Sequence, residues 1–352
     1  MTKIAYCIGI MSGTSLDGLD VVYVKLSKER QYYYEIIHSC TYPYSNQWIS
    51  LLKGAFEKAP ETLKALDVSY GGYIGSLVND FVKRYSIKQV DFVASHGHTI
   101  FHKPYENYTL QIGCGREIRR VTGCKVVFDF RTQDVALGGQ GAPLVPIGDA
   151  LLFPSFQYCL NLGGFANISF DALGERKAYD ICPVNIVLNH YMNHLGKPFD
   201  NKGELARMGS VDKRLLADLN NDPFYVLQTP KSLGFEFVKE RVIPLMDSYH
   251  LEIKDLLRTF LEHVAIQIAL VINPKGECRT LVTGGGAYND FLLERIKKLT
   301  TSKFIIPNVQ LLEFKEALIF ALLGFLRING EINCLKSVTG ASKDHSSGKI
   351  VF

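Results

Sequence analysis

The sequence lacks the features that mark several large classes of protein. Its eight cysteines form no C-x-x-C pair, so nothing indicates a disulfide framework, and a reducing compartment fits best. The longest apolar run, Ala317–Leu326, ends at Arg327 and falls short of the roughly 18 residues of a membrane span. The N-terminus has no signal-peptide pattern. We therefore expect a cytoplasmic protein that does not enter a membrane.

The chain also lacks a strong excess of charge. It carries 39 Lys and Arg against 35 Asp and Glu, a net charge of +4 over 352 residues. This small and scattered excess argues against nucleic acid as a partner. A hydrophobic fraction of 47% over this length is enough for two domains, each with its own core.

Apolar strand-like runs and amphipathic helical runs alternate along most of the chain, which predicts an α/β fold. The predicted strands are 4–10, 21–24, 31–41, 90–95, 108–112, 125–130, 158–170 (as a hairpin), 279–283 and 304–306. The predicted helices are 48–58, 61–85, 183–195, 255–272, 289–299 and 314–328, with a short helix between the strands at 108–112 and 125–130.

The first of three glycine turns joins two β-branched runs near the N-terminus. Glycine N–H groups and Ser or Thr hydroxyls can surround anionic oxygens, and a carboxylate beside them suits a phosphate that carries Mg²⁺. Asp17 is the candidate for that position, and an ordinary tight hairpin is the alternative. The predicted nucleotide-binding residues here are Gly13, Thr14, Ser15, Leu16, Asp17, Gly18, Leu19 and Asp20.

Two further glycine turns follow in the second half. Gly163-Gly164, with Asn167 beyond it, again separates two apolar strands, and Gly284-Gly285-Gly286 lies between a strand and a helix. The two similar hairpins suggest two related halves. A dinucleotide fingerprint and a Walker loop are both missing. Three such turns instead favour a nucleotide held between two lobes.

A separate glycine-rich segment, 138–143, interrupts the alternation of strands and helices, and it is the candidate domain boundary and hinge. We expect an N-terminal lobe over 1–140 and a C-terminal lobe over 141–330. The tail, 331–352, is a candidate to pack back onto the first lobe.

Two carboxylates are candidates for chemistry. Asp180 precedes Pro183 and a helix start, where backbone N–H groups favour the ionised form, and it could accept a proton from water or a hydroxyl. A helix-capping acid is the alternative. Glu316 lies near the start of a long apolar helix with Lys315 beside it, and a solvated first-turn acid is its alternative.

Further polar residues are candidates for substrate contact. Arg131 could pair with a substrate carboxylate or with an acid in its own segment. His96, His98 and His102 invite a metal interpretation, but no cysteine or carboxylate completes a recognised spacing. Contact with a sugar is the preferred interpretation for His96 and Thr99.

Taken together, the motifs resemble those of the anhydro-N-acetylmuramic acid kinases, a family in the actin-like ATPase superfamily. The resemblance covers nearly the whole chain and is most specific at 128–146. The motifs that carry it are 9–20, 128–134, 136–146, 162–167, 282–286, 315–317 and 337–342.

The resemblance implies a two-lobed actin-like fold, made of duplicated ribonuclease H-like domains with a cleft between them. It implies an ATP- and Mg²⁺-dependent kinase that opens 1,6-anhydro-N-acetylmuramic acid with water and phosphorylates O6 during peptidoglycan recycling. Asp180 would activate the water, with Glu316 in the same pocket. Asn185, which follows Asp180 in the motif, would contact the sugar. A homodimer is left open.

The sequence departs from the family pattern in three places. The common Asp-Thr-Gly-Pro-Gly-Asn is here 180–185, Asp-Ile-Cys-Pro-Val-Asn, and His-Gly-Gln-Thr is 96–99, His-Gly-His-Thr. The segment 231–236 replaces the usual Arg by Phe235. An ordinary sugar kinase without ring opening and a chaperone-like nucleotide switch remain the alternatives.

Overall fold

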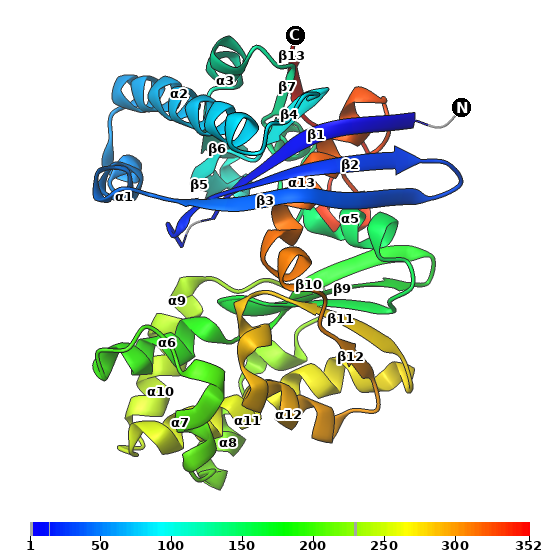
Figure 1. The fold of residues 1–352 in the computed structure, drawn as a ribbon. Coiled ribbons are helices and arrows are strands. Elements are labelled where there is room, and N and C mark those ends of the chain that lie inside the picture. Colours follow the sequence, from blue (N-terminus) through cyan, green and yellow to red (C-terminus); the bar gives the residue numbers. More distant parts are fainter. Residues whose placement is uncertain (1–2, 14, 229–230) are drawn as a thin grey trace. The chain divides into compact units, whose positions relative to one another are not determined.

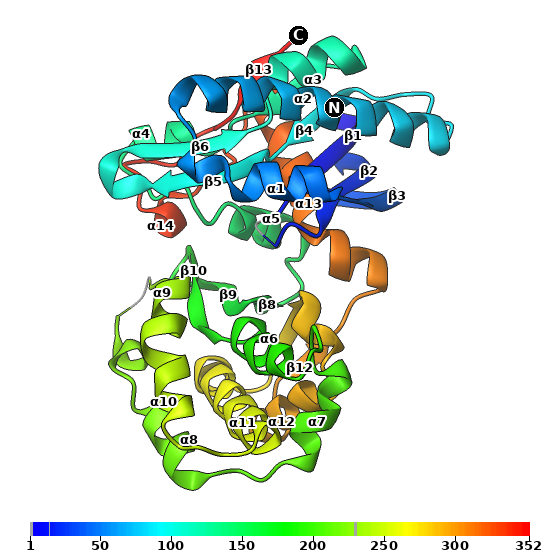
Figure 2. The ribbon, with the colours of Figure 1, turned by 90° about the vertical axis from the view of Figure 1, so that its left-hand side faces the viewer.

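The computed structural model describes residues 3–13, 15–228 and 231–352. Two compact units divide the chain (Figures 1 and 2). Unit 1 comprises Met1–Leu152 and Phe314–Phe352, and unit 2 comprises Phe153–Glu313. The sequence placed the first boundary after residue 140, whereas 141–152 and 314–330 belong to unit 1. The glycine segment 138–143 lies inside that unit because backbone and side-chain hydrogen bonds fasten it there.

The main sheet of unit 1 has the strand order β13-β7-β4-β1-β2-β3. Strand β2 is antiparallel to both β1 and β3, β4 runs parallel to β1, and β7 runs parallel to β4. The tail returns to this sheet, where β13 pairs antiparallel with β7. The strands are β1 (Lys3–Ser12), β2 (Gly18–Lys28), β3 (Tyr32–Pro43), β4 (Phe92–Ser95), β7 (Val126–Phe128) and β13 (Lys349–Val351).

Helices pack on this sheet, and β1 lies directly against α13. A Cβ at Gly9 would stand 2.1 Å from the backbone oxygen of Ala317, so only glycine permits this approach. A two-stranded sheet pairs β5 (His98–Lys103) with β6 (Tyr108–Ile112). The helices are α1 (Asn46–Lys53), α2 (Pro60–Arg84), α3 (Gly115–Thr122), α4 (Thr132–Ala136), α5 (Val145–Leu152), α13 (Val309–Ile328) and α14 (Lys336–Thr339).

The sheet of unit 2 repeats the same arrangement, with the order β10-β9-β8-β11-β12. Its first three strands are antiparallel, and β11 and β12 continue the sheet in parallel from β8. This duplicated ribonuclease H-like order confirms the predicted α/β class and the two related halves. The strands are β8 (Tyr158–Leu162), β9 (Phe165–Ala172), β10 (Glu175–Pro183), β11 (Arg279–Thr283) and β12 (Lys303–Ile305).

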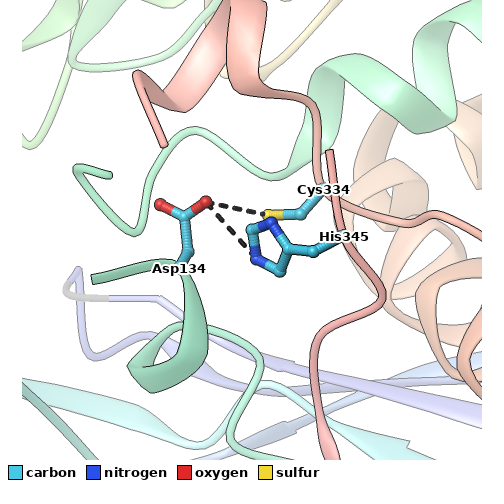
Figure 3. Close-up of side chains that lie close together, drawn as sticks. All are labelled: Asp134, Cys334 and His345. Atoms are coloured by element: carbon cyan, nitrogen blue, oxygen red, sulfur yellow. Dashed lines mark hydrogen bonds and ion pairs between the residues drawn. The ribbon is translucent and has the colours of Figure 1, made fainter. Parts of the chain in front are cut away.

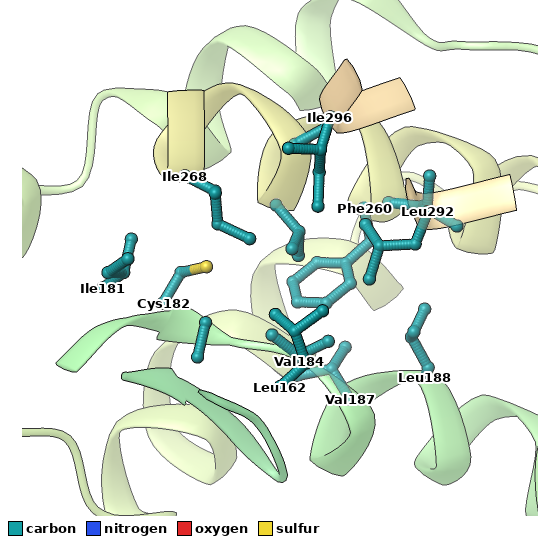
Figure 4. Packing of buried hydrophobic residues seen from close by; sticks show 14 of the residues in the cluster. Leu162, Ile181, Cys182, Val184, Val187, Leu188, Phe260, Ile268, Leu292 and Ile296 are labelled. Carbon is teal, nitrogen blue, oxygen red and sulfur yellow. The ribbon is translucent and has the colours of Figure 1, made fainter. Parts of the chain in front are cut away.

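The core of unit 2 forms around α11, whose apolar stripe the sequence predicted. Phe260 and Ile268 of this helix pack in one buried cluster with Leu162 of β8 and Val187 of α6 (Figure 4). The helices of the unit are α6 (Asn185–His194), α7 (Glu204–Met208), α8 (Lys213–Asn220), α9 (Phe235–Phe237), α10 (Ile243–Asp247), α11 (Ile253–Ile272) and α12 (Asp290–Leu299).

Two findings bear on the environment of the chain. Among the described helices, none combines the length and the apolar character that crossing a membrane requires. All eight cysteines lie in the described part of the chain, and each is free.

Truncating the buried Phe260 to Ala should destabilise unit 2 by about 3–5 kcal/mol, because a large side chain leaves a cavity in a packed core. Thermal unfolding monitored together with limited proteolysis measures the loss and locates it. The matched control is Leu270→Ala on the same helix, where the side chain is 62% exposed. Equal destabilisation by both variants would contradict this account of the core.

Candidate functional site

In unit 2, the two glycine turns meet at one end of the sheet. The Gly-Gly tip of the β8–β9 hairpin receives the start of α6, because Val184 N–H donates to the Gly164 carbonyl at 2.7 Å. The second turn lies against the end of β8: Gly284 has φ +85°, and a Cβ there would stand 2.7 Å from Asn161 Oδ1. Bare backbone therefore lines this corner, and Gly285 is exposed in it.

Strand pairing places two more predicted residues beside this corner. Asn185 begins α6, and its side-chain N–H donates to the Leu162 carbonyl at 3.3 Å. Asn167 is exposed on β9 and is the register partner of Asp180 on β10. The predicted unit 2 residues thus gather at one sheet end, although they are far apart in sequence.

Asp180 is half-buried within β10, next to an irregularity in the pairing between Asp180 and Cys182. Its Oδ2 accepts a hydrogen bond from Leu233 N–H at 2.8 Å. This bond lowers the pKa of the carboxyl, but burial raises it by more, so the pKa is raised. No described residue donates to Oδ1. The sequence predicted that a helix N-terminus would stabilise this carboxylate, and the structure corrects that prediction. Helix α6 begins only at Asn185, and the N–H that donates to Asp180 comes from a distant segment.

The sequence reasoning missed the role of the segment 231–233. Asp180 N–H donates to the Lys231 carbonyl at 3.0 Å, so this segment runs alongside the end of β10. The Lys231 ammonium donates to the carbonyls of Phe224 and Tyr225 at 3.0 and 3.2 Å, which fastens the segment in place. Burial lowers the pKa of Lys231. An irregular segment of this kind has no periodic sequence pattern, so the sequence showed only its departure from the family pattern.

In unit 1, the tip of the β1–β2 hairpin presents Ser15 and Asp17 to solvent. Leu16 has φ +61°, and its N–H donates to the Gly13 carbonyl. Thr14 lies outside the described residues. In the described part of the chain no cation pairs with Asp17, whose carboxylate is a hard oxygen donor of the kind that Mg²⁺ prefers.

The remaining predicted residues of this hairpin have structural contacts. A Cβ at Gly18 would stand 2.6 Å from the Tyr42 carbonyl oxygen, so close packing against β3 accounts for this glycine. The Leu19 side chain is fully buried in the core of unit 1. Asp20 accepts a hydrogen bond from the Thr41 hydroxyl at 2.6 Å. The side chains of Leu19 and Asp20 are therefore engaged within the sheet.

A buried polar chain stands at the end of β1. The hydroxyl of Ser12 bonds to Tyr44 at 2.7 Å and to His98 Nδ1 at 2.8 Å, and Tyr44 bonds onward to Tyr70 at 2.6 Å. Burial lowers the pKa of His98 to about 4. His98 is therefore neutral near pH 7 and serves as a hydrogen-bonding residue.

A second polar group joins His96 and Arg131. The Arg131 guanidinium donates to His96 Nε2 at 2.9 Å and to the Gly141 carbonyl at 2.7 Å. Burial lowers the pKa of Arg131 to about 10, although Glu316 opposes the shift. Burial and the nearby guanidinium lower the pKa of His96, so its ring is a neutral acceptor. The ring also contacts Phe320 of α13, one turn beyond Glu316, in a tilted arrangement with the ring centroids 4.6 Å apart.

Glu316 lies in the second turn of α13, so the alternative interpretation of a first-turn acid does not describe it. Its side chain reaches solvent, yet the surrounding protein raises the pKa of its carboxyl, opposed by Lys315 and Arg131. The neighbouring Lys315 is buried and pairs with the buried Asp149 at 2.7 Å. That pair anchors α13 to α5 and leaves Glu316 facing outward.

The other histidine-strand residues have local partners. Thr99 is half-buried and pairs with Gln111 across β5 and β6, and His102 Nδ1 bonds to the Thr109 hydroxyl at 3.2 Å. His96, His98 and His102 each bond to a different residue, and none belongs to a metal-binding group among the described residues. A shared zinc ion is therefore not what these histidines form.

Comparison with known proteins decides the family. The family model described as anhydro-N-acetylmuramic acid kinase matches residues 5–352. The chain belongs to the anhydro-N-acetylmuramic acid kinase family. Proteins of that name from Vibrio cholerae and from a Sulfurovum species are each 35% identical to it, over 98% and 99% of both chains. The chain is accordingly a phosphotransferase.

Solved structures show a weaker likeness to this kinase. Component A of the (R)-2-hydroxyglutaryl-CoA dehydratase of Acidaminococcus fermentans covers 90% of the chain, with 96% of its own length aligned. The sequence identity is 13% and the TM-score is 0.48.

One pocket of the kinase contains none of the predicted site residues. It has a volume of about 620 Å³ in unit 1 and lies beside β13, with Arg116, Phe128 and Arg327 in its wall. The ion pair of Lys349 with Asp129, at 2.7 Å, borders it. The predicted residues lie in other parts of the two units.

His98→Gln should make the stability of the kinase less sensitive to acid. An unfolded histidine has a pKa near 6.5, and the folded value is about 4. As the pH falls below 6.5, His98 therefore becomes protonated in the unfolded chain while it stays neutral in the native chain. The resulting loss of stability grows as pH falls and reaches about 3 kcal/mol near pH 4.

Unfolding midpoints of both proteins between pH 8 and pH 4 provide the measurement. The glutamine amide keeps a partner for Ser12, so the two curves should run in parallel above pH 7 and diverge below 6.5. Curves that stay parallel down to pH 4 would show that His98 does not remain neutral in the native chain.

Proposed function

We propose that this chain is a cytoplasmic ATP-dependent kinase that opens the anhydro ring of 1,6-anhydro-N-acetylmuramic acid with water and phosphorylates O6. The product is N-acetylmuramic acid 6-phosphate, an intermediate of cell-wall sugar recycling. Family membership supports the kinase activity. The observation that supports the ring-opening step is the carboxylate of Asp180, which is half-buried, has a raised pKa and accepts one backbone donor.

The reaction divides into two steps whose atoms balance. Asp180 takes a proton from water, and the hydroxide attacks the anomeric carbon C1 as the bond from C1 to O6 breaks. The released O6 then attacks the γ-phosphorus of ATP, and ADP leaves. A raised pKa brings a carboxylate closer to the range of an effective general base. Oδ1, to which none of the described residues donates, gives water a place to bind.

Both glycine corners support a nucleotide in this proposal. The exposed backbone at Gly285 and the Gly163-Gly164 turn offer space for adenosine or phosphate without a side chain in the way. The hairpin of unit 1 offers Ser15 and Asp17. Asp17 would hold Mg²⁺ brought in with ATP, and that ion would neutralise charge on the phosphates.

Glu316, Arg131 and His96 form the candidate sugar-contacting group of unit 1. Arg131 is fixed by His96 and Gly141, so its guanidinium is held in one orientation for a carboxylate such as the lactyl group of muramic acid. Thr99 and Asn185 remain proposed contacts of sugar hydroxyl or amide groups.

The direct test is incubation with Mg-ATP and the anhydro sugar in water enriched in heavy oxygen, followed by mass analysis. We expect one product that gains both phosphate and one heavy oxygen at C1. Phosphorylation only of sugar with an open ring would identify an ordinary sugar kinase. Hydrolysis of ATP without any phosphosugar would point to a nucleotide switch.

Asp180→Asn should keep the fold and ATP binding but lower turnover of the anhydro sugar by about 10²–10⁴-fold, since an amide cannot accept the proton. Single-turnover rates and a nucleotide-binding titration measure the two effects. Asp171→Asn, on the exposed end of the neighbouring strand, is the matched control. Near wild-type turnover in Asp180→Asn would falsify the assignment of the base.

Glu316→Gln should lower kcat/KM for the sugar and leave nucleotide affinity unchanged, because the proposal places this residue beside the sugar. Glu313→Gln, on the same helix and bonded to the exposed Tyr288, is the control and should behave as the wild type. If both variants are fully active, Glu316 has no part in the site.

A further inference from the structure

A buried group of three potential metal ligands lies in unit 1, outside the proposed catalytic residues. Asp134 of α4 meets Cys334 and His345 of the C-terminal tail (Figure 3). Their ligand atoms all lie within 4.8 Å of one another, and all three residues are buried. The proposed mechanism uses none of them.

The orientation of His345 is that of a metal-binding histidine. Its Nδ1 lies 3.1 Å from the Lys343 carbonyl oxygen, and because a carbonyl only accepts, Nδ1 must carry the proton. In a neutral ring the lone pair is then on Nε2. A hydrogen bond from the other ring nitrogen to a carbonyl is the usual support of a ligating histidine.

The lone pair on Nε2 has no hydrogen-bond donor. This nitrogen is buried, makes no hydrogen bond among the described residues, and faces Asp134 Oδ1 at 3.5 Å. Two acceptors that face each other inside a protein repel, unless a proton or a cation lies between them. The Cys334 sulfur lies 3.5 Å from the same Oδ1 and adds a soft donor from another element.

These distances fit one tetrahedral ion. Bonds of about 2.0 Å to nitrogen and oxygen and about 2.3 Å to sulfur separate neighbouring ligand atoms by about 3.2–3.6 Å at tetrahedral angles. Both measured separations, 3.5 Å, fall in that range. A thiolate, an imidazole and a carboxylate together favour zinc over magnesium or calcium.

We propose that Asp134 Oδ1, Cys334 Sγ and His345 Nε2 bind one Zn²⁺ ion, with a water molecule as the fourth ligand. The thiol of Cys334 releases its proton to solvent as the sulfur binds. One thiolate and one carboxylate then balance the charge of the ion, so burial leaves no net charge. Gly141 N–H and the Thr339 hydroxyl, each 2.7 Å from an oxygen of Asp134, orient the carboxylate.

The site would be structural. It joins the tail to α4 and to the glycine segment that follows, which already bonds to the tail where Gln140 N–H donates to the Thr339 carbonyl at 2.7 Å. Metal binding to the folded chain alone would raise its stability.

The experiment uses the full chain without an affinity tag. After purification and after dialysis against Zn²⁺, metal analysis should give about one bound zinc per chain. Replacement by Co²⁺ should produce the charge-transfer absorption of a cobalt–thiolate bond. Cys334→Ser should abolish this absorption, and His345→Asn should reduce bound metal at least tenfold.

Two controls match these variants. Cys278→Ser alters another buried cysteine, bonded to the Ser302 hydroxyl, and His250→Asn alters an exposed histidine at φ +49°. Both should keep the metal and the cobalt band. If the wild-type chain binds under a tenth of an equivalent and shows no cobalt–thiolate band, the group is a metal-free ion pair and the proposal fails. This wild-type result decides the matter even where a variant does not fold.

Discussion

Much of unit 1 depends on the hydrogen bonds that the buried carboxylate of Asp134 accepts. A carboxylate without exposure to water is stable only where donors surround it. Here the donors are Gly141 N–H and the Thr339 hydroxyl. Since these come from the glycine segment and from the tail, the same acid holds both against α4. The Arg131 guanidinium in turn donates a hydrogen bond to the Gly141 carbonyl and another to His96.

The surroundings of the Asp180 carboxylate differ from those of Asp134. Asp180 is only half-buried, one backbone N–H reaches one of its oxygens, and burial raises its pKa. A structural acid is enclosed by donors, whereas an acid that must exchange protons has to keep an oxygen available. The contrast between the two aspartates supports a catalytic role for Asp180 and a structural role for Asp134.

Local patterns predicted the elements, because β-hairpins and amphipathic helices are specified by residues near one another in sequence. The repeated hairpins and the long helix α11 were predicted in this way. Long-range pairings left no such signal. The donor Leu233, the buried pair of Lys315 with Asp149, and the contact of Cys334 and His345 with Asp134 each join distant segments. The sequence suggested that the glycine segment is a hinge, because it does not show the hydrogen bonds that fasten this segment to Arg131, Asp134 and Thr339.

The departure from the family pattern after Asp180 has a physical consequence. Ile181 and Cys182, where the family commonly has Thr and Gly, are almost fully buried in the core of unit 2. Two side chains anchored in a core restrict the backbone more than a Thr-Gly pair would. The end of β10 is therefore fixed by the packing of these two side chains in the core and by its hydrogen bonds to the segment 231–233. Asp180 is therefore fixed by contacts that no local motif encodes.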